Sequence, residues 1–207
     1  MVRGSGPLAA GAGRSSSLRL SWRSTRSAQR SAPERDIRAA HVAGRSRIRS
    51  ESCTLGIDPG NHSGWAVLDS RLELLDHGEL RFDRVKQPSP SSIVKTLSCR
   101  YNLHVACIET QYLGESAHAT IVLAQNAGRW IEACVSVDIP VLTMIAPSTW
   151  QAAELGCRSA TKRSDRKKMS ISRCLGLWRV TLSDHCADAA LIARWAAVES
   201  QHGGSLA

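Results

Sequence analysis

The sequence predicts an α/β domain in which helices pack on a mixed β-sheet. Short apolar runs that end at acids or turn residues alternate with helical stretches, in the order strand, strand, strand, helix, strand, helix, strand, then helices. With 207 residues, the chain is long enough to form one such domain with its own core, together with a tail.

Five segments are predicted to be strands because they are short, apolar and bounded by turn-forming residues. The first two flank the turn-forming sequence PGNHSG and predict a hairpin, and the third alternates apolar and polar positions. The last two, HVACIE and PVLTMIA, have the continuous apolar character of buried strands. The predicted strands cover residues 53–58, 65–70, 72–80, 104–109 and 140–146.

Five further segments are predicted to be helices. Ser91 or Ser92 is expected to cap the first, after a loop over 81–92, and Pro147 is expected to open the third. The fourth is basic and amphipathic. The second and longest helix has apolar positions every three to four residues, at Ile121, Ala124, Ala127 or Gly128, Ile131 and Val135. The predicted helices cover residues 93–101, 117–137, 149–156, 161–177 and 184–199.

The positive charge of the chain lies in its first 50 residues. They contain 11 Arg, no Lys and two acids, which gives the same +9 as the whole chain, so residues 51–207 are net neutral. Because residues 1–50 are also rich in Ser and poor in apolar periodicity, we predict a disordered Arg/Ser-rich tail. Three interpretations stay open: an electrostatic arm on nucleic acid, an organelle transit peptide, or an over-extended start.

Seven cysteines form no CxxC pair and lie mostly among apolar neighbours. This scatter predicts reduced, buried thiols rather than disulfides or a zinc site, and therefore a reducing compartment. We expect a cytoplasmic protein, or an organellar one if residues 1–50 are a transit peptide. No run of about 18 apolar residues occurs, so no membrane span is expected.

Acidic residues lie at positions where they could act as catalytic or metal-binding groups. Asp58 ends the first predicted strand and Glu109 the fourth, while Asp184, His185 and Asp188 open the last helix. Strand ends meet at one sheet edge, and helix positions three or four apart share a face. Asp58 alone could be an ordinary turn residue, and Asp184 and Asp188 could complement the helix dipole. Glu109 fits such an explanation less well, because a lone carboxylate at the end of a buried strand is costly unless it is paired or binds a metal. Together they predict an oxygen-rich cluster suited to Mg²⁺ or Mn²⁺.

Three motifs in this order resemble the RuvC family of Holliday-junction resolvases, within the ribonuclease H-like superfamily. They are LGIDPGNHSGWAVLD, CIETQY and HCADAALIARW, and the resemblance as a whole spans roughly residues 53–197. The resemblance implies a ribonuclease H-like sheet in a nuclease domain over 51–207. It also implies two Mg²⁺ or Mn²⁺ ions per site, held by Asp58, Glu109 and Asp188. Three residues before the final acid, where the family usually has Asp, this chain has His185. We expect His185, rather than Asp184, to complete the site.

A basic stretch precedes the last helix. Residues 158–179 carry eight basic side chains and one acid, in a domain that is otherwise balanced. Such a surface suits contacts with the DNA backbone, which confer affinity rather than sequence preference. Gln111 and Tyr112, just after the second motif, are either DNA contacts or plain loop residues. The residues expected to bind DNA are Lys162, Arg163, Arg166, Lys167 and Lys168.

The resemblance implies a metal-dependent endonuclease that resolves four-way DNA junctions as a homodimer, each subunit nicking one strand to leave a 5′-phosphate. One alternative keeps the fold but acts on RNA–DNA hybrids, flaps or branched phage DNA. Another is a non-catalytic junction-binding protein. An actin-like ATPase is disfavoured because residues 51–207 are too few for two lobes. Whether a helicase partner exists is left open by the sequence.

Overall fold

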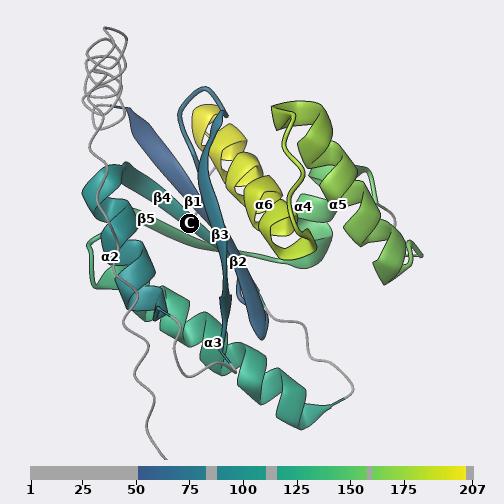
Figure 1. Ribbon diagram of the computed structural model, residues 1–207, viewed down its shortest axis with the longest axis horizontal. Helices are drawn as coiled ribbons and strands as arrows, with labels where there is room; N and C mark the ends of the chain where they lie inside the picture. Colours follow the sequence, from purple (N-terminus) through teal and green to yellow (C-terminus); the bar gives the residue numbers. More distant parts are fainter. Residues whose placement is uncertain (1–50, 83–87, 111–115, 158–159, 204–207) are drawn as a thin grey trace, which may run out of the picture.

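The computed structural model describes residues 51–82, 88–110, 116–157 and 160–203, so the predicted tail lies outside the described residues. A five-stranded sheet has the order β3-β2-β1-β4-β5 (Figure 1). β1 pairs antiparallel with β2, and β2 with β3, whereas β1–β4 and β4–β5 are parallel. The predicted mixed sheet is therefore confirmed. Its strands are β1 (Ser52–Asp58), β2 (His62–Leu68), β3 (Leu74–Arg81), β4 (Asn102–Glu109) and β5 (Val141–Ile145).

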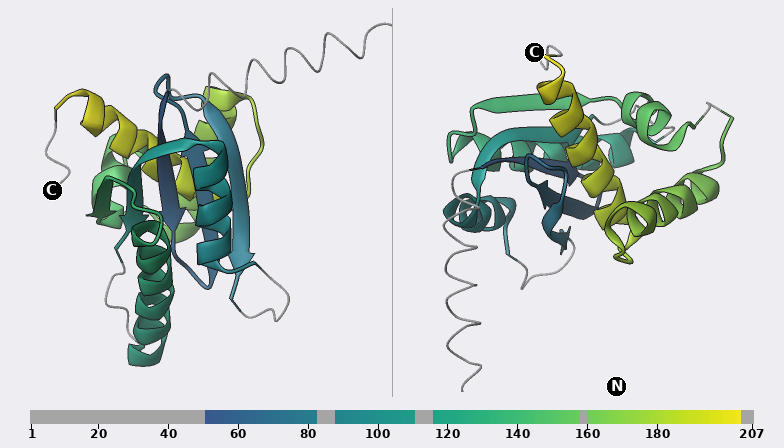
Figure 2. Two further views of the ribbon diagram at one scale, coloured as in Figure 1. Left: turned by 90° about the vertical axis from the view of Figure 1, so that its left-hand side faces the viewer. Right: turned by 90° about the horizontal axis from the view of Figure 1, so that it is seen from above.

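Helices cover both faces of the sheet (Figures 1 and 2). Two helices pack with Trp130 in the core on one face, and three pack around Trp150 in the core on the other. Each core is continuous with the sheet, because adjacent residues of the buried strands point to opposite faces. The helices are α2 (Pro90–Arg100), α3 (Ala117–Val135), α4 (Pro147–Leu155), α5 (Arg163–Trp178) and α6 (Asp184–Gln201).

Serines one position before the helices supply the caps of α2 and α6. Ser89 accepts a hydrogen bond from the Ser92 N–H at 3.2 Å, so the expectation of Ser91 or Ser92 as the cap is wrong. Pro90 occupies the first turn, where its missing N–H has no helical partner to lose. Ser183 caps α6 by accepting from the Cys186 N–H at 3.3 Å.

The apolar spacing predicts the buried face of α3 only in part, since Ala127 is buried and Ile131 packs against the core, whereas Ile121 and Val135 are exposed. The residues that pack into the core are Asn126, Ala127, Trp130, Ala133 and Cys134. Ile121 is 56 % exposed and Val135 is 60 % exposed. The helix thus carries two apolar stripes, and the large Trp130 ring flanked by small residues decides which of them faces the sheet.

The cysteine prediction holds for five of the seven side chains. All seven thiols are free, but Cys99 is exposed and Cys157 is half-buried, against expectation. Burial raises the pKa of the Cys107 thiol to about 12, which leaves it an unreactive part of the core. Among the described residues, no helix is long and apolar enough to cross a membrane.

Candidate active site

Two acids lie side by side where β1 and β4 end. The strands are parallel neighbours, with Ile57 opposite Ile108, so Asp58 and Glu109 reach the same edge of the sheet. Asp58 faces Gly64 across the antiparallel β1–β2 pair. The topology therefore brings together the two strand-end carboxylates that the sequence singled out.

The N-terminal end of α6 lies directly against the β1–β2 pair because a glycine faces it. A Cβ on Gly64 would stand 2.0 Å from the carbonyl oxygen of His185. A Cβ on Gly56 would similarly stand 2.2 Å from the carbonyl oxygen of Ala189. Only residues without a side chain allow the helix backbone to come this close to the strands. Gly64 ends the segment PGNHSG that the sequence predicts as a turn, but it belongs to β2.

The turn between β1 and β2 is held by the inner face of α3. Trp130 donates its indole N–H to Ser63 Oγ at 3.1 Å, and that hydroxyl donates to the Gly60 carbonyl at 2.9 Å. The Asn126 amide donates to Asn61 Oδ1 at 3.3 Å. These buried bonds tie α3 to the turn that immediately follows Asp58.

The four predicted site residues converge on one cavity of about 290 Å³. Two come from strand ends and two from the first turn of α6. The other lining residues come from α3, α4, α5 and the segment after β4. The cavity is lined by Asp58, Glu109, Thr110, Leu123, Pro147, Gln151, Arg163, Arg166, Lys167, His185 and Asp188.

His185 and its neighbour Asp184 have different partners. Nδ1 of His185 lies 3.0 Å from Oδ2 of Asp58, so the ring donates Nδ1–H to the carboxylate and leaves Nε2 as its other functional nitrogen. Asp184 forms an ion pair with Lys167 and does not line the cavity. Asp184 is the first residue of α6, and Ser183 before it is the helix cap.

The carboxylates are in surroundings that oppose their negative charge. Burial, and then the charge of Asp58, raise the pKa of Glu109 to about 8. Burial likewise raises the pKa of Asp188 to about 7, with Asp58 adding to the effect. The hydrogen bond to Asp58 raises the pKa of His185, against the opposing effect of burial. Grouped acids of this kind are stabilised in their ionised form by a bound cation.

The donor set suits Mg²⁺ or Mn²⁺, which take carboxylate oxygens and tolerate an imidazole. As the side chains stand, however, no group of three or more His, Cys, Asp or Glu residues in the described part of the chain is arranged to hold one ion. In this arrangement His185 and Asp58 are hydrogen-bonded to each other. It is thus the chemistry of the residues, rather than their arrangement, that fits a divalent cation.

The five residues expected to bind DNA do not lie together. Arg163, Arg166 and Lys167 line the same cavity as the acids. Lys162 is exposed at the start of α5. Lys168 instead lines a separate hollow with Glu154 and Arg173. Three of the five basic residues therefore lie beside the acids. Gln111 and Tyr112 lie outside the described residues.

One functional contact escaped the sequence analysis. Trp150, which the sequence suggests is a core or helix anchor, is buried and also donates its indole N–H to Oε1 of Glu109 at 2.8 Å. A buried indole N–H requires an acceptor, and this requirement is the signal that could have pointed to Trp150. Which acceptor it finds depends on the placement of α4 beside β4, which local sequence does not encode.

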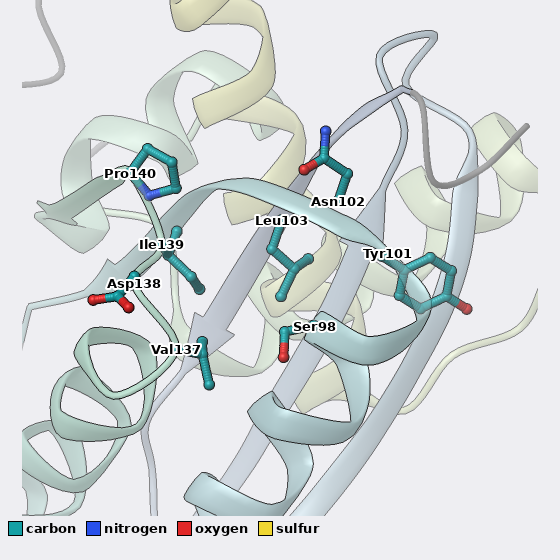
Figure 3. A pocket seen from close by; sticks show the side chains of 8 residues that line it. All are labelled: Ser98, Tyr101, Asn102, Leu103, Val137, Asp138, Ile139 and Pro140. Atoms are coloured by element: carbon teal, nitrogen blue, oxygen red, sulfur yellow. The ribbon is translucent and has the colours of Figure 1, made fainter.

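A second hollow, of about 410 Å³, lies where β4 and β5 begin, away from the acids (Figure 3). Its described lining has one carboxylate, Asp138, and no basic or histidine side chain. This hollow is therefore separate from the acids at the ends of β1 and β4.

The fold and the acids at its sheet edge together define a class of protein. A mixed five-stranded sheet with helices on both faces, and acids at the ends of two parallel neighbouring strands, is a ribonuclease H-like fold.

The chain belongs to the RuvC family, since residues 54–194 match the family model described as crossover junction endodeoxyribonuclease RuvC. The resemblance inferred from the three motifs is confirmed. A comparison with curated proteins gave no match.

Two solved structures of the family share the fold. One is Thermus thermophilus RuvC in complex with a Holliday junction substrate, with a TM-score of 0.57 and 19 % identity over 73 % of this chain and 96 % of that one. Another structure of Thermus thermophilus RuvC has a TM-score of 0.56 and 18 % identity, with the same coverage.

Proposed function

We propose that this protein is a metal-dependent endonuclease that resolves four-way DNA junctions by symmetric nicking. Membership of the RuvC family supports the reaction class, and the junction-bound Thermus thermophilus relative supports the substrate. The observation that carries the proposal is the convergence of two strand-end acids, His185 and Asp188 on one cavity lined by basic side chains.

Asp58, Glu109, His185 and Asp188 would hold Mg²⁺ or Mn²⁺, expected as two ions per site. When bound, the metal would lower the pKa of the attacking water and stabilise the negative charge that develops on the phosphate. Hydrolysis would leave a 5′-phosphate and a 3′-hydroxyl.

The basic side chains have a separate task, which is to bring a phosphate to the acids. Arg163 and Arg166 extend from the first turn of α5 into the cavity lining. Guanidinium groups pair with phosphate oxygens through two parallel hydrogen bonds. Lys167 also lines the cavity, and its ion pair with Asp184 holds its ammonium in place. Phosphate contacts of this kind position the strand without reading its sequence.

We propose that the working form is a homodimer. A four-way junction has two-fold symmetry, and a two-fold dimer presents two sites of matching symmetry. The outer stripe of α3, which includes Ile121, Ala124, Gly128 and Val135, is exposed and apolar. A face of this kind is suited to self-association.

The substrate is tested by cleavage of a synthetic four-way junction with Mg²⁺ or Mn²⁺, beside linear duplex and an RNA–DNA hybrid. We expect paired nicks in the junction alone, abolished by Asp58→Asn. Hybrid or flap cleavage that Asp58→Asn also abolishes would keep the site but replace the substrate. Tight junction binding without cleavage at any metal concentration would instead support a non-catalytic junction-binding protein.

A further inference from the structure

Glu109, the acid at the end of β4, is hydrogen-bonded to a residue from a different element. Trp150, on α4, donates its indole N–H to Oε1 of Glu109 at 2.8 Å. The indole is 1 % exposed, so water does not compete for this bond. Its length lies within the ordinary range of N–H···O hydrogen bonds.

The backbone around this bond is fixed on both sides. Just past Glu109, the Thr110 N–H donates to the Ile145 carbonyl at 2.7 Å, and the Thr110 hydroxyl donates to the same oxygen at 3.1 Å. Ile145 ends β5, and Pro147 opens α4 two residues later. The strand end that bears Glu109 and the helix that bears Trp150 are thereby connected through one carbonyl.

The Trp150 ring is fixed by its packing. Trp150 belongs to the buried core between the sheet and the helices α4 to α6. A packed ring of this size cannot change rotamer without opening a large void. The donor therefore points at Glu109 in one direction only.

The chemistry of the Trp150–Glu109 pair suits a carboxylate, Glu109, that is oriented before it binds a cation. An indole N–H only donates and does not titrate, so it neither competes for metal nor protonates the acid. A carboxylate has two oxygens with about four lone-pair directions, and one indole bond uses part of that capacity. Glu109 also lines the cavity that contains Asp58 and Asp188.

We propose that Trp150 is a positioning residue, whose indole N–H orients the Glu109 carboxylate for binding of Mg²⁺ or Mn²⁺. This inference rests on the proposed function, since orientation of Glu109 matters only if the site takes a metal. The role is separate from contact with DNA or with reacting atoms.

The first test compares Trp150→Phe with the wild-type full chain in binding Mn²⁺, measured as free Mn²⁺ by electron paramagnetic resonance without DNA. Loss of groups that orient a metal ligand lowers metal affinity by about tenfold to a hundredfold, and we expect a fall in this range. Trp178→Phe is the matched control. It removes an indole N–H that donates to the Leu72 carbonyl at 2.8 Å, outside the cavity, and is expected to bind Mn²⁺ like wild type.

The second test separates positioning from loss of packing. In a Glu109→Gln background, Trp150→Phe should weaken Mn²⁺ binding less than about twofold further, because interacting residues are non-additive in such a cycle. An equal additional loss in that background would show that the ring acts only by filling space, and would overturn the inference.

A third readout needs no variant and therefore survives any failure of Trp150→Phe to fold. In ¹⁵N-labelled wild-type protein, the assigned indole N–H resonance of Trp150 should shift as Mg²⁺ is added, while that of Trp178 should stay in place. An unmoved Trp150 resonance at saturating Mg²⁺ would contradict the inference.

The outcomes distinguish this inference from the proposed function. Unchanged Mn²⁺ affinity in Trp150→Phe, with junction cleavage intact in wild type, would overturn the positioning role alone. Absence of both metal binding and cleavage in wild type would overturn both proposals.

Discussion

Two glycines determine how closely α6 approaches the strands that bear the site. Gly64 lies against the His185 backbone and Gly56 against that of Ala189, and each would clash if it had a Cβ. His185 and Asp188 depend on this approach, since they reach the cavity from the first turn of α6. The glycines are therefore as necessary to the site as the residues that line it.

Gly64→Ala is expected to weaken Mn²⁺ binding by at least about tenfold, since a Cβ there would displace the backbone of His185, a proposed metal ligand. Overpacking is also expected to lower the free energy of unfolding by about 1–3 kcal/mol. Urea denaturation and Mn²⁺ titration measure the two effects. Gly176→Ala is the control, because Gly176 lies within α5 with nothing near its missing Cβ. Wild-type metal affinity in Gly64→Ala would contradict this account of the approach.

The buried acids also make a prediction about pH. In the metal-free protein the pKa of Glu109 is raised to about 8 and that of Asp188 to about 7, so between about pH 4 and 8 the folded state retains protons that the unfolded chain releases. The raised pKa of His185 acts in the same direction, since the folded state holds that proton to a higher pH. Stability falls with rising pH wherever the folded state binds more protons.

The melting temperature of the metal-free protein should therefore fall from pH 5 to pH 8, and added Mg²⁺ should restore more stability at pH 8 than at pH 5. The second effect follows because metal binds the deprotonated ligands and stabilises the folded state in proportion to its affinity. Calorimetric melting with and without Mg²⁺ measures both. Asp58→Asn should lessen the fall, since Asp58 contributes to raising both carboxyl pKa values. A melting temperature that rises over this range would contradict the assignment.

At the scale of whole elements, α4 and α6 are joined by a buried ion pair. Arg194 on α6 donates from Nη1 to both carboxylate oxygens of Glu154 on α4, at 2.7 and 2.6 Å. The Glu154 side chain is 4 % exposed and depends on this partner for its charge. Because α4 carries Trp150 and α6 carries two cavity residues, this pair connects the two helices that complete the site.

Arg194→Ala should lower the free energy of unfolding by about 3–5 kcal/mol, because it leaves a buried carboxylate unpaired. The double variant Glu154→Leu/Arg194→Leu should recover most of that loss, since it removes the charge along with its partner. Urea denaturation of the three proteins tests the prediction. Equal destabilisation of the single and double variants would show that packing, rather than the unpaired charge, is responsible.

The level of whole elements also shows which features of the structure could be predicted from the sequence. Apolar runs and turn residues were enough for all five described strands and for the order of the helices, because those signals are local. The sequence also predicted that four site residues converge, because strands of one sheet end at the same edge and because the motifs mark these positions. The four residues are Asp58, Glu109, His185 and Asp188. The full inner face of α3 could not be predicted in this way. Two apolar stripes of the helix fit the same periodicity, and only packing against the sheet determines which stripe is buried. The Trp150–Glu109 bond and the Lys167–Asp184 pair are likewise contacts between distant segments, which residue spacing does not specify.

For the whole molecule, the outer stripe of α3 makes a prediction about assembly. In Figure 2 the helix extends beyond the sheet, and its outward residues Ile121 and Val135 are more than half exposed. The double variant Ile121→Glu/Val135→Glu should be a monomer, because like charges on a self-complementary face repel across a two-fold axis. Light scattering after size exclusion measures the mass. Val180→Glu, at an exposed apolar position away from α3, is the control. A dimer that persists in the double variant would exclude this stripe as the interface.

The most direct test of the whole account uses a supercoiled plasmid with an extruded cruciform, cut by wild-type protein and by mixed dimers in which one subunit carries Asp58→Asn. Two symmetric nicks within one binding event convert the plasmid to a linear form, whereas a single nick releases the supercoil and gives an open circle. We predict linear product from wild type, open circle from the mixed dimers, and neither from Asp58→Asn alone. Linear product from Asp58→Asn alone, or open circle alone from wild type, would contradict a dimeric resolvase built on the Asp58 site.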